Sequence, residues 1–426
     1  MTFPDSTYMY LSHLSLTNFR NYGRLELDFN AGPVLLYGRN AQGKTNLLEA
    51  VYYLATTRSP HADTDQQLLN WTANETEDVV VVGRLAAQVV TNAGTKHLEM
   101  RLIKEQKNRN GSSFRREALV NRRKVRLMDL IGNLRATLFL PEDLQLVTGP
   151  PASRRRYADI TLCQVDPIYC RNLAAYNKVL EQRNALLRQI NESGGGRDVL
   201  PIFTDRLVKL GSHIFARRAI LFAYLAHAAQ RIHYEDLTNR LETIRLNYLP
   251  RLEDAQPGRS REENDAVADM ITIADWLRTQ PEGKQEAIID RYQRAIETSV
   301  DQDIARGSTS LGPHRDDWFF QVNGRPLSSY GSRGQQRSAM LALKLAEIGW
   351  MKEQTGETPI LLLDEVAAEL DARRRELLLE VTQKASQAIL TTTDPGMFAG
   401  TFLQQAQTLH VSNGRVTHDA PLRNGN

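Results

Sequence analysis

The stretch "GPVLLYGRNAQGKTNLLEAVYYLA", residues 32–55, contains the most specific pattern in the chain. Its central eight residues, from Gly38 to Thr45, match the pattern G-x-x-x-x-G-K-[ST] of a phosphate-binding loop. A short apolar run before the loop predicts a buried strand, and a helical pattern follows it. The glycines let backbone N–H groups turn toward phosphate oxygens, and the helix start adds positive potential. This context predicts a nucleotide site in an α/β domain.

The residue types within the loop indicate their chemical roles. Lys44 is expected to reach the β- and γ-phosphates of ATP, and the hydroxyl of Thr45 is expected to bind Mg²⁺. The ATP-binding residues predicted from the sequence are Gly38, Arg39, Asn40, Ala41, Gln42, Gly43, Lys44 and Thr45.

A second segment, "ILLLDEVAAELD" at residues 360–371, supplies the carboxylates that such a site needs. Four apolar residues predict a buried strand that ends at Asp364, where a carboxylate can hold the Mg²⁺ ion. Glu365 is well placed to polarise an attacking water molecule and is the predicted catalytic residue. An Asp-Glu pair alone is also compatible with a solvated strand end, but the phosphate-binding loop favours the nucleotide site.

Composition limits the class of protein. The chain has 426 residues, so two domains are expected. Hydrophobic residues make up 41% and charged residues 24%, which is typical of a soluble globular protein. The net charge is only +3, so any surface for nucleic acid must be local.

The sequence also indicates a compartment. Two cysteines, Cys163 and Cys170, are too few for a disulfide framework and are interpreted as packing residues. No uninterrupted apolar run reaches the roughly 20 residues of a membrane helix. The first residues lack the pattern of a secretion signal. We therefore expect a cytoplasmic protein.

The predicted elements divide the chain into three segments. Residues 1–150 contain strand patterns and the phosphate-binding loop, residues 151–305 are mainly helical, and residues 306–426 again contain strands and helices. Each flank holds only part of the nucleotide site. We therefore expect both flanks to form one α/β domain, with the helical segment inserted into it.

Two helices of the insertion carry apolar residues at alternating spacings of three and four, at about 173–190 and 203–221. Arg183 interrupts the first pattern, and a glycine-containing break separates the two helices. This arrangement predicts an antiparallel pair that forms a short arm. A helical bundle has the same period and is an alternative.

Several segments together carry a resemblance to a known family. They are "LTNFRNY", "GRNAQGKTNLLEAVYYLA", "LFLPEDLQLVTGPPASRRRYAD", "LGPHRDD", "YGSRGQQRSAMLALKLAE" and "LLLDEVAAELD". On these segments the chain resembles the SMC/ABC-type ATPases and, most closely, the RecF family of bacterial recombination mediators. The resemblance covers essentially the whole chain and implies an ABC-type ATPase head, a P-loop NTPase fold, with an inserted all-helical arm.

The resemblance also implies a site shared between two copies of the chain. It identifies Ser332, Arg333, Gly334 and Gln335 as the signature that contacts ATP on the partner copy, and Asp371 as the D-loop residue. Two chains would thus enclose two ATP molecules. An ordinary helix start has a similar composition and is the alternative. Thr393 stands where many ABC ATPases have a histidine, which suggests slow hydrolysis, and Gln145 is interpreted as a surface residue.

The function implied by the resemblance is ATP-dependent DNA binding, with weak ATPase activity that DNA stimulates. The resemblance also implies that the protein is associated with the nucleoid. The DNA would be gapped duplex and single-strand/double-strand junctions. The expected partners are RecO and RecR, with loading of RecA in recombinational repair, replication-fork maintenance and SOS induction. A transporter-type ATPase subunit is disfavoured by the helical insertion and the basic stretch, and an SMC-like DNA-bridging ATPase by the short arm.

Residues 101–126 form the strongest candidate for a DNA surface. The candidate contacts are Lys104, Lys107, Arg109, Arg115, Arg116, Arg122, Arg123, Lys124 and Arg126. Such contacts would go to phosphates and be independent of sequence, although a basic run is also compatible with a solvated surface. Arg154–Arg156 form a second candidate. Arg20 and Arg58 could contact phosphate or form surface ion pairs, and His314 and Arg315 have no role assignable from the sequence.

Overall fold

The computed structural model describes residues 9–74, 79–108, 111–252 and 284–418. These residues form two compact units. The first combines residues up to Asp143 with residues from Glu347 onward, and the second runs from Leu144 to Ala346. Within the described residues, no helix combines the length and apolarity needed to cross a membrane. Neither Cys163 nor Cys170 is part of a disulfide bond.

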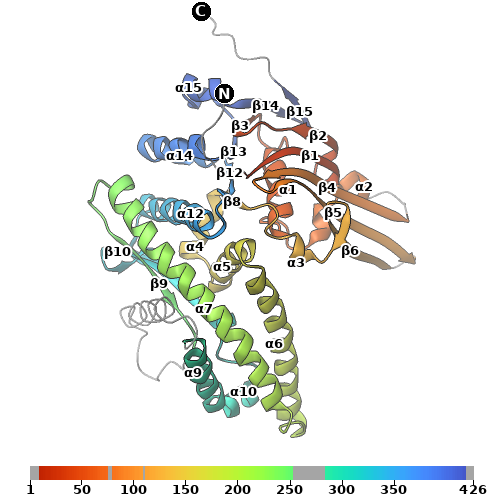
Figure 1. Cartoon of the computed structure of the whole chain (residues 1–426), viewed down its shortest axis with the longest axis vertical. Helices are drawn as coiled ribbons and strands as arrows, with labels where there is room; N and C mark the ends of the chain where they lie inside the picture. Colours follow the sequence, from red (N-terminus) through yellow and green to blue (C-terminus); the bar gives the residue numbers. More distant parts are fainter. Residues whose placement is uncertain (1–8, 75–78, 109–110, 253–283, 419–426) are drawn as a thin grey trace, which may run out of the picture. The chain divides into compact units, whose positions relative to one another are not determined.

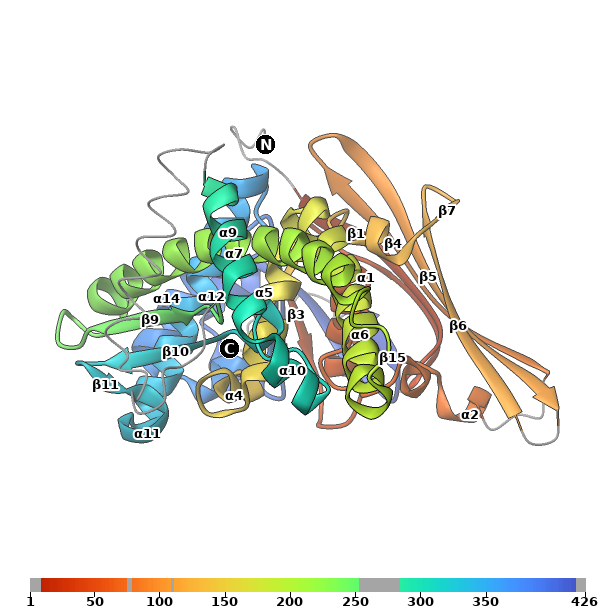
Figure 2. The ribbon, with the colours of Figure 1, turned by 90° about the horizontal axis from the view of Figure 1, so that it is seen from below.

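The first unit contains an antiparallel sheet built mainly from the N-terminal strands. Its strand order is β2-β1-β4-β5-β6-β7. The strands are β1 (Met9–Phe19), β2 (Tyr22–Asp28), β4 (Val80–Thr91), β5 (Gly94–Asn108), β6 (Gly111–Val120) and β7 (Arg123–Val125). Figure 2 shows β4, β5 and β6 as long neighbouring strands. The alternating patterns in the N-terminal sequence therefore correctly predicted strands.

A second sheet of the same unit is mostly parallel and supports the phosphate-binding loop. Its order is β15-β14-β3-β13-β12-β8, and only the β14–β15 pair is antiparallel. The strands are β3 (Gly32–Tyr37), β8 (Ala136–Phe139), β12 (Ile360–Asp364), β13 (Gln387–Thr392), β14 (Gln407–Ser412) and β15 (Arg415–His418). Because β3, β13 and β12 are parallel neighbours, their carboxyl ends meet at one edge of the sheet.

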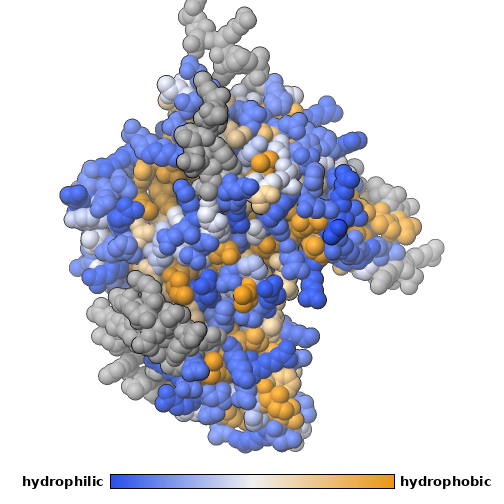
Figure 3. Space-filling model, viewed as in Figure 1, coloured by the Kyte–Doolittle hydropathy of each residue, from blue (hydrophilic) through white to orange (hydrophobic). Residues whose placement is uncertain are grey.

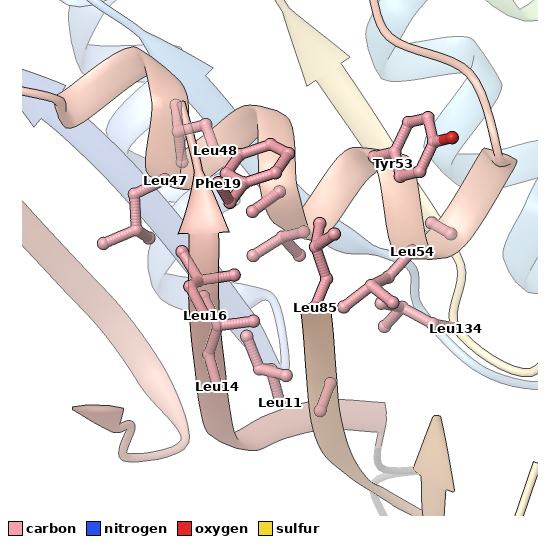
Figure 4. Close-up of a cluster of buried hydrophobic side chains, with 14 of the residues drawn as sticks. Leu11, Leu14, Leu16, Phe19, Leu47, Leu48, Tyr53, Leu54, Leu85 and Leu134 are labelled. Carbon is pink, nitrogen blue, oxygen red and sulfur yellow. The ribbon is translucent and has the colours of Figure 1, made fainter. Parts of the chain in front are cut away.

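Helix α1 (Lys44–Thr56) joins the two sheets through a shared apolar core. Figure 4 shows Leu47 and Leu48 of α1 among side chains of β1, including Leu16 and Phe19. The same cluster includes strand residues of the parallel sheet, such as Leu362. The core thus fixes the start of α1 at the end of β3.

Shorter helices complete the first unit. They are α2 (Trp71–Asn74), α3 (Leu127–Leu130), α13 (Val366–Glu369), α14 (Ala372–Lys384) and α15 (Gly400–Gln405).

Hydrophilic side chains predominate on the face of the molecule seen in Figure 3. Val80 and Val82, near the start of β4, are among the exposed apolar residues.

The second unit is mainly helical. Helices α6 (Pro167–Ser193) and α7 (Leu200–Ile232) follow each other across a short glycine-containing turn and lie side by side (Figure 1). The predicted antiparallel pair is therefore present. Helix α7 also packs against α9 (Lys284–Thr298), and α6 packs against α10 (Val300–Arg306). The pair is part of a small bundle, because its apolar stripes are shared with further helices.

The remaining elements of the second unit include a short antiparallel sheet, β11-β10-β9. Its strands are β9 (Ile244–Leu249), β10 (Asp317–Val322) and β11 (Arg325–Pro326). The helices are α4 (Gln145–Thr148), α5 (Pro151–Val165) and α11 (Leu327–Tyr330), and α12 (Arg333–Thr355) begins here and ends in the first unit.

The division of the chain differs from the sequence-based boundaries. Residues 306–346 belong to the helical unit, whereas the sequence analysis placed them with the C-terminal part of the head. Strand β10 explains the difference, because it pairs with β9 and Asp317 forms an ion pair with Arg154 of α5. The head resumes only within α12.

Buried polar contacts give the "LGPHRDD" segment a structural role within the second unit. The Asp316 carboxylate accepts hydrogen bonds from Arg218 and Tyr248, and all three side chains are buried. His314 contacts the Tyr176 hydroxyl through Nδ1 at 2.7 Å, and its Nε2 lies 3.1 Å from the carbonyl oxygen of Thr309. These contacts join the segment to α6, α7 and β9.

Arg183, which interrupts the apolar pattern of α6, is also buried. It forms an ion pair with the buried Asp303 at 2.8 Å and donates to Thr309. A charged residue inside a helical bundle requires such a partner, so the interruption in the pattern marks an internal ion pair.

The burial of His314 predicts a pH dependence of stability. Burial lowers the pKa of His314 to about 4 from 6.5. The neutral imidazole is favoured in the folded state, so the stabilising contribution is complete above pH 6.5 and is lost as the pH falls toward 4. His314→Gln keeps a polar side chain of similar length that can still reach the Thr309 carbonyl oxygen, and it cannot titrate. Urea unfolding from about pH 7 to about pH 4 should show a loss in the wild type that exceeds the variant's by on the order of 3 kcal/mol.

Comparison with the variant is necessary because a neighbouring group titrates in the opposite sense. Burial raises the pKa of Asp316 to about 6, so its contribution favours the folded state at low pH and is lost as the pH rises. This carboxyl group is present in both proteins, so the difference between them reports on His314. Parallel stability curves for the two proteins would contradict the prediction.

Candidate nucleotide-binding site

The phosphate-binding loop begins where β3 ends, and its backbone requires glycine at two positions. Gly38 has φ 153° and Gly43 has φ 117°. A Cβ atom on Gly38 would lie 2.2 Å from the carbonyl oxygen of Val411, and one on Gly43 would lie 2.6 Å from Nδ2 of Asn21. The Val411 backbone leaves no room for a side chain at Gly38, and the positive φ favours glycine at both positions, so the two glycines of the motif allow the loop to turn tightly.

Two neighbouring segments hold the loop in place. The backbone N–H of Asn413, in the β14–β15 turn, donates to Oε1 of Gln42 at 2.8 Å. The side-chain amide of Asn21 donates to the carbonyl oxygen of Gln42 at 2.9 Å, and the Tyr22 hydroxyl donates to the carbonyl oxygen of Gly43. Asn21 and Asn413 were not predicted from the sequence as supports, because they lie in other segments of the chain that only the fold brings to the loop.

Lys44 lies inside the curve of the loop. Its buried ammonium group donates to the carbonyl oxygens of Gly38 at 2.7 Å and Arg39 at 3.0 Å. The same nitrogen lies 3.3 Å from Oε1 of Glu365. Lys44, the first residue of α1, is therefore in direct contact with the predicted catalytic residue Glu365.

Thr45 and Asp364 meet although 319 residues separate them in sequence. The Thr45 hydroxyl donates to Oδ2 of Asp364 at 2.8 Å. The other carboxylate oxygen, Oδ1, accepts a hydrogen bond from the Thr391 hydroxyl at 2.6 Å. A hydroxyl and a carboxylate oxygen are the hard oxygen donors that Mg²⁺ prefers, so the residues present fit this ion.

Glu365 follows the strand in a left-handed conformation, with φ 53°. This sharp turn directs the chain from β12 into α13. The loop, the two carboxylates and neighbouring residues enclose a pocket of about 460 Å³. The lining residues are Asn40, Ala41, Gln42, Gly43, Lys44, Thr45, Asn46, Pro141, Glu142, Asp364 and Glu365.

Three of the lining residues were not assigned from the sequence: Asn46, Pro141 and Glu142. Pro141 and Glu142 come just after β8, the neighbour of β12 in the parallel sheet. The available signal was their position after a short apolar run, since parallel strands end at the same edge. The parallel pairing of that strand was not evident from the sequence.

The predicted signature residues lie at the start of α12, in the second unit. The Ser332 hydroxyl accepts from the Gln335 backbone N–H at 3.2 Å, and Oε1 of Gln335 accepts from the Ser332 backbone N–H at 2.8 Å. This reciprocal pair is a capping box. Ser332 and Arg333 are exposed, and the Gln335 amide also donates to Glu242.

The other residues noted in the sequence lie at element ends. Asp371 caps α14 by accepting the Arg374 backbone N–H at 3.0 Å and also pairs with the Arg374 side chain. Thr393 is exposed just after β13, and Gln145 is exposed at the start of α4.

Part of the basic stretch is neutralised by acidic neighbours. Arg115 pairs with Glu105 and Glu117, Lys124 also pairs with Glu117, and Arg116 pairs with Asp65. Arg109 and the side chain of Lys107 lie outside the described residues.

Three arginines of the β6–β7 region differ from these paired residues. Arg122, Arg123 and Arg126 are exposed, and no ion pair involves them among the described residues. Among the described residues of the candidate DNA surface, these three therefore combine exposure with the absence of an ion pair.

Two other arginines noted in the sequence, Arg20 and Arg154, are engaged within their own units. Arg20 forms two hydrogen bonds of 2.7 Å with the buried carboxylate of Glu49, which favours the ion-pair interpretation for this residue. Arg154 pairs with Asp317. Arg58 is exposed.

The model of the RecF/RecN/SMC N terminal domain matches residues 10–417. The DNA replication and repair protein RecF of Chloroflexus aurantiacus is 39% identical over 416 residues, which cover 96% of this chain and 99% of that protein. The chain belongs to the RecF family. The RecF protein of Bacillus subtilis is 36% identical, with 96% of this chain and 100% of that protein covered.

Solved structures agree with this family assignment. A structure described as the recombination mediator protein RecF with ATPrS, in the RecFOR pathway, superposes with a TM-score of 0.79 and 29% identity. It covers 97% of this chain and 99% of that chain. A second structure, described as RecF with ATP, has the same TM-score. The expected ABC-type ATPase fold of the RecF and SMC proteins is confirmed.

Replacing Lys44 tests the nucleotide site directly. Lys44→Ala removes the only cation among the residues that line the described pocket, so the affinity for ATP should fall about 100-fold or more. Titration with a fluorescent ATP analogue measures this loss. Lys352→Ala, an exposed lysine of α12 in the same unit, is the matched control and should bind normally. Equal affinity in the two variants would place the nucleotide elsewhere.

Proposed function

We propose that this chain is an ATP-dependent DNA-binding protein of the RecF type, in which ATP joins two copies on DNA. The observation that supports this most strongly is the contact between Thr45 and Asp364, with Lys44 and Glu365 beside it. These four side chains supply a cation that can bind the phosphates, two oxygen donors for a metal ion and a carboxylate that can orient a water molecule. Membership of the RecF family connects this chemistry with DNA repair.

The arrangement suits hydrolysis of the bond between the β- and γ-phosphates. Mg²⁺ held by Thr45 and Asp364 would neutralise charge on the phosphate oxygens. Lys44 would exchange its loop carbonyls for phosphate, which would also weaken its pairing with Glu365. The Glu365 carboxylate would then orient a water molecule and accept its proton as the new O–P bond forms and the bond to the leaving ADP oxygen breaks.

A second copy of the chain would complete the site. Ser332 and the N–H groups at the start of α12 form a small polar surface suited to the partner's γ-phosphate. Closing two such sites would join two chains around two ATP molecules. Thr393 lacks the acid–base capacity of the histidine common in ABC ATPases. This favours slow ATP hydrolysis and therefore a long-lived ATP-bound dimer.

The closed dimer would bind DNA. We propose duplex DNA and single-strand/double-strand junctions in gapped DNA as ligands, and weak ATPase activity stimulated by DNA. RecO and RecR would be partners in loading RecA during recombinational repair, fork maintenance and SOS induction, in the bacterial cytoplasm at the nucleoid. The similar RecF structures are described as parts of the RecFOR pathway, which supports this assignment.

The shared site predicts a specific pattern of dimerisation. Glu365→Gln should slow hydrolysis and yield a stable dimer with ATP, measured by sedimentation. Adding Ser332→Arg should return the chain to a monomer while leaving ATP affinity within about twofold, because a long cation would obstruct the partner's phosphate site. Ser193→Arg, on the exposed end of α6, serves as the control and should stay dimeric. A monomeric Glu365→Gln chain at saturating ATP would contradict the clamp.

The three exposed arginines of the β6–β7 region make a separate prediction about DNA. Replacing Arg122, Arg123 and Arg126 with glutamine should weaken duplex binding. The slope of log affinity against log salt should also fall, by up to about one for each phosphate that these side chains neutralise. Anisotropy titrations with and without ATP measure both effects.

The matched control for this experiment replaces Arg115 and Lys124, whose charges are already paired. An equal reduction of affinity in the control would exclude the local surface formed by the three arginines. Equal affinity with and without ATP in the wild type would exclude the nucleotide switch.

A further inference from the structure

Thr391 occupies a position that no motif of the sequence identifies. It lies near the end of β13, directly beside Asp364 of β12 in the parallel register. The residue is 2% exposed. Its hydroxyl donates to Oδ1 of Asp364 at 2.6 Å and accepts the backbone N–H of Glu365 at 2.9 Å. One hydroxyl thus contacts the metal-binding carboxylate of Asp364 and the backbone of Glu365, two of the four residues that the proposed reaction uses.

The two contacts are compatible because a hydroxyl has one proton to donate and lone pairs with which to accept. The carbonyl oxygen of Leu363 also lies near this hydroxyl, but at 3.5 Å it is a much weaker acceptor than the carboxylate. The proton therefore goes to Asp364. The lone pair facing Glu365 satisfies an N–H group at the end of β12, where the chain leaves the strand.

Each contact fixes a different part of the site. Holding Oδ1 of Asp364 sets the carboxylate orientation that leaves Oδ2 toward Thr45. Holding the Glu365 N–H stabilises a residue with φ 53°, a conformation that non-glycine residues rarely adopt. Without this hydroxyl, both the carboxylate and the turn would lose a buried partner.

We propose that Thr391 is a positioning residue that couples the metal-binding carboxylate to the catalytic turn. This inference rests on the proposed ATPase function. Thr391 touches neither nucleotide nor water in this role; it acts through Asp364 and Glu365. Groups that orient metal ligands in this way typically contribute on the order of 10- to 100-fold to metal affinity or activity.

The chain offers a close control in the neighbouring residue. Thr392 is also buried on β13, but its hydroxyl donates to the carbonyl oxygen of Asp394 at 3.0 Å and contacts the Met397 sulfur. Thr391→Val and Thr392→Val remove the same atom from adjacent positions of one strand. Thr391→Ser keeps the hydroxyl at the critical position.

The experiment measures ATP binding against Mg²⁺ concentration, binding in EDTA, and hydrolysis. For Thr391→Val we expect the Mg²⁺ concentration for half-maximal ATP binding to rise about tenfold or more, and kcat to fall by a similar factor. Binding in EDTA should change little, because Lys44 and the loop are intact. Thr392→Val and Thr391→Ser should resemble the wild type in all three measurements.

The outcomes separate this inference from the function on which it rests. If wild-type protein does not bind ATP, or if Lys44→Ala binds as well as wild type, the proposed function is wrong. If wild type binds and hydrolyses ATP and Thr391→Val has the Mg²⁺ dependence and kcat of Thr392→Val, the positioning role is wrong. Should Thr391→Val fail to fold, Thr391→Ser and Thr391→Ala replace it. Both lack the methyl group, and equal Mg²⁺ dependence in those two variants would overturn the inference.

Discussion

The hydrogen bond from Thr45 to Asp364 is the contact on which the rest of the site depends. It joins the first turn of α1 to the end of β12, residues separated by most of the chain. The contact requires β3, β13 and β12 to lie parallel and in register, so that their carboxyl ends meet. Continuous burial of β12 and β13 stabilises that register, since these strands are covered on both faces.

Charge and backbone geometry at this edge are interdependent. A buried lysine is held by loop carbonyls and by Glu365, while Asp364 is held by two hydroxyls. Each of these three charged groups therefore has a partner within the site, which offsets the cost of removing it from water. The same partners can be exchanged for phosphate oxygens and a cation. A site of this kind is organised in advance for its ligand.

In the helical unit, buried charged residues have a structural role, because they form ion pairs that connect the elements. Arg183 with Asp303, and Arg218 with Asp316, are placed where a simple apolar pattern would have leucine or valine. They join helices to the segment around His314, and they explain why residues 306–346 fold with the helices. Sequence periodicity located α6 and α7, but it could not assign partners to the charges that interrupt them.

The sequence by itself determined the phosphate-binding loop, the strand that ends at Asp364, the helical insertion and the family, because these depend on local spacing and on whole motifs. Tertiary structure alone decided which of three consecutive threonines faces Asp364, which basic residues are already paired, and that Pro141 and Glu142 line the pocket. Those facts depend on strand register and on contacts between segments distant in sequence, and the hydrophobic pattern of a single strand is the same for any neighbour it pairs with.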